Sequence, residues 1–81
     1  SNVITVSDTG QNNASDACAF GTNNTKLFYD RDTLLADSVV LFTNESLTEI
    51  FDGNAKFYKI VESNQSMQVS SSGVISNLAS C

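Results

Sequence analysis

The chain has 81 residues and a net charge of −5, with 4 Lys or Arg, 9 Asp or Glu, no His and 2 cysteines. This length allows one domain at most, and so small a domain usually needs a disulfide, a metal or a partner subunit for stability. Too few cations are present for a phosphate-binding surface, so we expect no nucleic-acid partner. No apolar run reaches the roughly 18 residues of a membrane span, so no membrane partner is expected.

The first residues also lack the basic start and the apolar stretch of a signal peptide. We therefore expect a chain that either is mature after cleavage or leaves the cell by another route. Assembly into a particle that is released by lysis is one such route.

Residues 3–6 (VITV) are a β-branched run that favours a strand, and residues 7–16 (SDTGQNNASD) have the composition of turns and linkers. The sequence therefore predicts an N-terminal arm over residues 1–13, detached from a compact domain over residues 14–81. The strand could pair with an edge of its own sheet or add to an edge of a neighbouring subunit. The residues that would form this assembly arm are Val3, Ile4, Thr5 and Val6.

Short apolar runs follow at a spacing of about ten residues, which is typical of a small all-β sandwich or partly open barrel. They predict about seven short strands in all. The runs after the arm lie at residues 17–20, 26–29, 38–42, 47–51, 56–61, 67–70 and 74–78.

Some of these segments allow a sharper expectation than others. Residues 38–42 (SVVLF) form a continuous apolar run and are expected to be a buried strand. Residues 47–51 (LTEIF) form either an irregular strand or a turn with apolar side chains in the core, and residues 30–37 could hold one helical turn. Asp52 and Gly53 are expected to form the turn of a central hairpin, because Gly tolerates a positive φ.

The sequence gives little support for a catalytic function. A Ser or Cys nucleophile needs a neighbouring base, usually His, and the chain has none. Asp30 and Asp32 flank Arg31, and Asp37 follows. The DRD group at 30–32 could bind Ca²⁺, but the EF-hand pattern is not met because position 34 is Leu. We expect a solvated acidic loop instead, and hence no enzyme, no metal and no cofactor.

Two aromatic residues are candidates for ligand binding. Tyr29 and Tyr58 are the aromatics best placed to keep a solvent-exposed hydroxyl, which would suit a sugar-binding or docking surface. The alternative is that both are half-buried strand residues that serve only the core.

Cys18 and Cys81 are separated by 63 positions (81 − 18). A small exported chain with an even number of cysteines usually pairs them, which predicts a disulfide. Two buried free thiols in a reducing cytosol are the alternative.

The order of short motifs between the two cysteines resembles a small module of bacteriophage virion proteins, such as tail-fibre tips and decoration proteins, and of some bacterial surface proteins. The matching steps are Cys18, FYD at 28–30, VVL at 39–41, FTN at 42–44, LT at 47–48, a Phe before GN at 53–54, FYKI at 57–60, SGVI at 72–75 and Cys81. The chain departs from the pattern at Ile50, where the module often has Pro.

The resemblance implies a non-enzymatic protein on the virion surface that binds or displays. A capsid decoration protein is the first expectation, because the chain is short and lacks a shaft or coiled coil. Its partners would be the major capsid or tail protein, a second copy of the chain, or a host-surface glycan. The alternatives are a receptor-binding module at a tail-fibre or spike tip, and a secreted bacterial adhesion domain.

Overall fold

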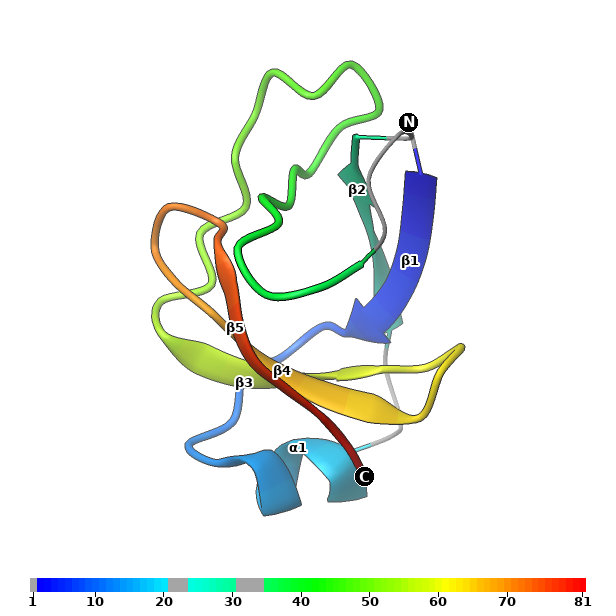
Figure 1. The fold of residues 1–81 in the computed structure, drawn as a ribbon, viewed down its shortest axis with the longest axis vertical. Coiled ribbons are helices and arrows are strands. Elements are labelled where there is room, and N and C mark those ends of the chain that lie inside the picture. The colour runs from blue at the N-terminus through cyan, green and yellow to red at the C-terminus, as the bar shows by residue number, and fades with distance from the viewer. Residues whose placement is uncertain (1, 21–23, 31–34) are drawn as a thin grey trace.

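The computed structural model describes residues 2–20, 24–30 and 35–81 (Figure 1). These residues form five strands and one short helix: β1 (Asn2–Ser7), α1 (Ala14–Ala19), β2 (Asn24–Tyr29), β3 (Lys56–Ile60), β4 (Gln65–Val69) and β5 (Ile75–Ser80). All five strands belong to one antiparallel sheet in the order β2-β1-β3-β4-β5. The all-β prediction is confirmed, whereas the prediction of about seven strands is not.

The sheet consists of two well-paired parts that meet at a narrow junction. β1 and β2 pair along their whole length, from Asn2 with Tyr29 to Ser7 with Asn24. β3, β4 and β5 form a meander, but β1 pairs with β3 only through Val6 and Ile60. The β1–β2 pair can therefore diverge from the meander on either side of this junction, as Figure 1 shows.

The core lies on one face of this sheet, under the long segment that joins β2 to β3. Alternation along each strand sends every second side chain inward. On β3, Tyr58 and Ile60 are buried while Phe57 and Lys59 are half-buried, so this strand follows the alternation. The buried core consists of Ile4, Val6, Leu27, Tyr29, Leu41, Tyr58, Ile60, Met67, Val69 and Ile75.

The detached N-terminal arm is not confirmed, because β1 lies inside the sheet between β2 and β3. Ile4 and Val6 belong to the core, so the strand is held by apolar burial as well as by its ladder. The linker-like residues that follow are also ordered: Gln11 and Phe57 exchange two backbone hydrogen bonds of 2.9 Å. Asn and Ser are abundant there because they serve turns and a helix cap, so polar composition was a poor guide to detachment.

Residues 38–42 are not a buried strand. The segment forms isolated bridges, Val40 with Val74 and Phe42 with Phe28, and only Leu41 is fully buried. An extended segment against a core alternates its side chains whatever its composition. The expectation for residues 30–37 lies largely outside the described residues.

Residues 47–51 also differ in part from the prediction. Phe51 packs against the core, but Ile50 is 53% exposed. The predicted central hairpin is wrong, because β3 pairs with β1 and β4 and not with residues 47–51. The turn between Phe51 and β3 is present, but its positive φ angles lie at Asn54 (53°) and Ala55 (58°) rather than at Gly53. Gly53 is needed for another reason: a Cβ there would lie 2.3 Å from the carbonyl oxygen of Val69.

Candidate functional site

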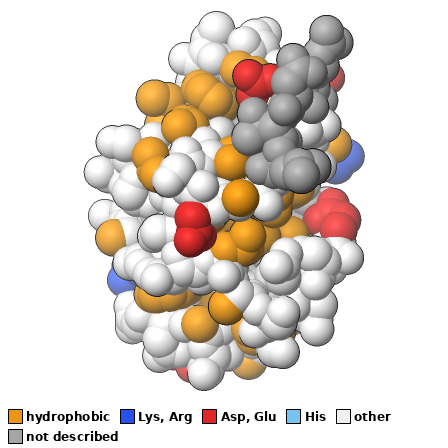
Figure 2. Space-filling model, in the orientation of Figure 1, with side chains coloured by type: hydrophobic (Ala, Val, Ile, Leu, Met, Phe, Trp, Pro, Cys, Tyr) orange, Lys and Arg blue, Asp and Glu red, His pale blue; other side chains and the backbone are white. Residues whose placement is uncertain are grey.

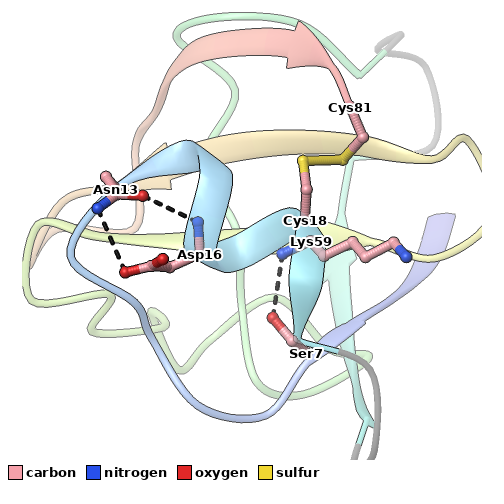
Figure 3. Close-up of a disulfide and its surroundings, with 6 residues drawn as sticks. All are labelled: Ser7, Asn13, Asp16, Cys18, Lys59 and Cys81. Carbon is pink, nitrogen blue, oxygen red and sulfur yellow. Dashed lines mark hydrogen bonds between the residues drawn. A yellow bond between two sulfur atoms is a disulfide. The ribbon is translucent and has the colours of Figure 1, made fainter.

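A disulfide joins Cys18 on α1 to Cys81 just after β5, with a Cα–Cα distance of 5.6 Å (Figure 3). It confirms the predicted pairing. The backbone N–H of Cys81 also donates to the carbonyl oxygen of Asn64 at 3.0 Å, which continues the β4–β5 pairing past the end of β5. The last residues of the chain are therefore fixed by one covalent bond and one hydrogen bond.

The helix that carries Cys18 is short and depends on its surroundings. Asn13 caps it: its side-chain oxygen accepts the N–H of Asp16 at 2.8 Å, and its amide nitrogen donates to the Asp16 carboxylate at 3.3 Å (Figure 3). Ala17 is completely buried as α1 packs against β3 and β4. A helix of six residues is too short to be stable alone, so the cap, this packing and the disulfide hold it.

Side chains complete the narrow junction between β1 and β3. The hydroxyl oxygen of Ser7 accepts the N–H of Lys59 at 3.0 Å (Figure 3), and the carboxylate of Glu62 accepts the N–H of Thr5, with both oxygens at 2.9 Å. Burial alone would raise the pKa of Glu62, but the hydrogen bonds from Thr5 and the attraction of Lys26 outweigh it and lower the pKa. Backbone groups that would otherwise lack a strand partner are thus satisfied by a serine and a carboxylate.

The four residues of the predicted assembly arm have different surroundings. Ile4 and Val6 point into the core, Thr5 is half-buried, and Val3 is 49% exposed. Of the four, Val3 therefore offers the largest apolar surface to a partner.

Tyr29 and Tyr58 do not present exposed rings. Their exposed fractions are 9% and 6%, and the hydroxyl of Tyr58 donates to the carbonyl oxygen of Gly53 at 3.2 Å. Burial, with a smaller effect of Asp52, raises the pKa of Tyr58. Phe51 meets its ring edge to face, with centroids 5.3 Å apart. Both tyrosines belong to the core, which agrees with the second of the two alternatives, and ligand binding by either stays a prediction.

An open hollow of about 490 Å³ lies beside the segment that follows β2. Its lining consists of Asp30, Asp37, Ser38, Val39, Val40 and Phe42. One oxygen of Asp37 accepts the N–H of Leu78 on β5 at 3.2 Å. The sequence singled out both acidic residues but not Val40 and Phe42, because an apolar run gives no sign of which side chains face outward.

Within residues 2–20, 24–30 and 35–81, no group of three or more potential metal ligands comes together. The same residues include no helix with the length and hydropathy needed to cross a membrane.

Fold and covalent structure define the chain as a small all-β domain bracketed by a disulfide. Comparison with known proteins found no matching family model, no matching curated protein and no matching solved structure. The function must therefore be argued from the residues themselves.

Proposed function

We propose that this chain is a non-enzymatic structural protein of a bacteriophage virion, displayed on the particle surface as a capsid decoration protein. The observation that carries the proposal is the disulfide between Cys18 and Cys81, whose loop contains β2, β3, β4 and β5 but not β1. Disulfides persist in oxidising surroundings such as the exterior of a released particle. The motif order between the two cysteines supports the same assignment by its resemblance to virion modules.

The position of β1 changes the proposed mode of attachment. Adding β1 to a neighbouring sheet would first require separating it from β2 and exposing Ile4 and Val6, which are buried in the core. Attachment through exposed side chains of the folded domain avoids this loss of apolar burial. We therefore propose docking by the folded domain, with Val3 as one contact.

Quantitative mass spectrometry of purified particles, prepared without reductant, tests the proposal. A decoration protein should be present in numbers comparable to the major shell protein, with Cys18 and Cys81 linked. A few copies per particle would instead identify a component of a tail-fibre or spike tip. Absence from all particles would refute the virion assignment.

A further inference from the structure

A row of four apolar side chains crosses one face of the molecule. Val3 of β1 is paired with Phe28 of β2. Phe42 is paired with Phe28 on one side and with Ile50 on the other. Directly paired residues of antiparallel segments project their side chains to the same face. At the usual strand separation of about 4.8 Å, the row is about 14 Å long. These four residues are called the apolar stripe below.

Burial of the neighbouring residues supports this assignment of faces. The exposed fractions of Ile4, Leu27 and Leu41, each adjacent in sequence to a stripe residue, are 6%, 2% and 0%. The two ends of the stripe, Val3 and Ile50, are 49% and 53% exposed. Hydrophobic side chains also gather at the surface over the segment between β2 and β3, in the upper part of Figure 2. The stripe therefore lies on the face opposite the core.

The hollow adjoins the stripe, because Phe42 belongs to both. Asp30 follows Phe28 by two positions and Asp37 lines the other part of the hollow. Among residues 2–20, 24–30 and 35–81, those that line the hollow include these two acidic side chains and no Lys or Arg. Glu49, next to Ile50, is also exposed. Lys26, two positions before Phe28 on β2, is an exposed cation on the same face. Asp30, Asp37 and Glu49 outnumber it, so the described surroundings of the stripe are negatively charged on balance.

We propose that the apolar stripe and the hollow together bind a partner protein segment whose apolar side chains are flanked by Lys or Arg. Apolar area alone does not distinguish partners, but the charge does, since acidic groups attract a basic segment and repel an acidic one. A second copy of this chain fits poorly, because it carries a net charge of −5 and would place like charges together. On the proposed function, this face is the one that meets the shell; the chemistry of the surface does not depend on that assignment.

The test uses the full chain, labelled with ¹⁵N, and three synthetic peptides of equal length: alternating Leu and Lys, alternating Leu and Glu, and alternating Ser and Lys. We expect the Leu–Lys peptide to shift the amide signals of Val3, Phe28, Phe42 and Ile50, and added salt to weaken its binding. The Leu–Glu and Ser–Lys peptides should bind at least about ten times more weakly, since the first lacks the positive charge and the second lacks the apolar side chains.

Two isosteric variants give a matched comparison. Val3→Thr removes apolar surface from the stripe, whereas Val61→Thr makes the same change outside it, at a residue that is 44% exposed. Val3→Thr and Ile50→Thr should each weaken binding of the Leu–Lys peptide by about threefold, and Val61→Thr should not. Asp37→Asn should weaken it too, while its amide oxygen keeps an acceptor for Leu78.

Three results would overturn the proposal: no binding of the Leu–Lys peptide, equal binding of the Leu–Glu peptide, or an equal loss in Val61→Thr. Sedimentation that shows a dimer lost in Ile50→Thr would identify a second copy as the occupant and overturn it as well. Absence of the chain from particles would refute the virion assignment and leave the peptide result unaffected, so the two failures are distinguishable.

Discussion

Removing the disulfide should be the most damaging covalent change that leaves the core intact. The bond between Cys18 and Cys81 closes a loop across a separation of 63 residues, which includes β2, β3, β4 and β5. In the chain-entropy treatment, a cross-link of this span stabilises the folded state by about 4 kcal/mol, by restricting the unfolded chain. Small domains have a total stability of only about 5–15 kcal/mol. The double variant Cys18→Ala, Cys81→Ala should therefore lose a large part of its free energy of unfolding.

Urea unfolding followed by circular dichroism measures this loss. With a slope of about 1 kcal/mol per molar urea for a small domain, the midpoint should fall by about 3–4 M. The unaltered chain with reductant should behave like the double variant, and the double variant should not respond to reductant. A loss of less than about 1 kcal/mol would refute the reasoning, because it would mean that α1 and β5 are held without the cross-link.

Three further changes test local features, each by urea unfolding. Gly53→Ala should destabilise the fold by about 2 kcal/mol or more, because its Cβ would lie 2.3 Å from the carbonyl oxygen of Val69; an unchanged midpoint would contradict this contact. Ala55→Gly should stabilise it by about 1 kcal/mol, since Ala55 has a φ of 58°, and a loss of stability would show that its methyl group matters more than its backbone. The hydrogen bonds from Thr5 and the charge of Lys26 lower the pKa of Glu62 in the folded protein. The contribution of Glu62 to stability is therefore present above the pKa of the unfolded chain, near 4.5, and is lost as the pH falls through the lower pKa of the folded state. Glu62→Gln should therefore lower stability slightly at pH 7 and flatten the decline in acid, and an unchanged pH profile would refute this.

Strand content could be predicted where alternation and local turns agree. The apolar runs at 56–61, 67–70 and 74–78 overlap β3, β4 and β5, and Gly73 in the turn between β4 and β5 has a positive φ of 77°. The turn near Asp52 and Gly53 is present, but the hairpin that the sequence predicts around it is not, because residues 47–51 do not pair with β3. The left-handed angles at Asn54 and Ala55 belong to a turn in which the N–H of Lys56 donates to the carbonyl oxygen of Gly53, while Gly53 itself lies close to Val69 of β4. Local propensity does not contain that long-range contact.

Long-range pairing also explains the other differences. Nothing in residues 3–6 specifies a partner, so the sequence leaves the choice between their own sheet and another subunit open, and the structure places β1 between β2 and β3. The helix α1 was missed because six residues with an Asn cap have little intrinsic preference, and tertiary contacts decide. The sequence does not identify Val40 and Phe42 as outward-facing, because a continuous apolar run does not show which of its alternating side chains face the core.

The division of the sheet leads to one more prediction. The disulfide binds α1 to the β3–β4–β5 part, while the apolar stripe is built on β1, β2 and the segment that follows β2. The two features lie toward opposite ends of the longest axis, which extends over 30 Å (Figure 1), and only Val6 and Ile60 pair directly between β1 and β3. Sites so far apart with few shared contacts usually act independently. Removal of both cysteines should therefore lower the free energy of unfolding without changing the affinity for the Leu–Lys peptide. The affinity is measured without urea, at a temperature at which the ¹⁵N spectrum still shows a folded domain. A parallel loss of affinity in that folded state would mean that the narrow junction transmits strain, and that the disulfide orders the docking face as well as the fold.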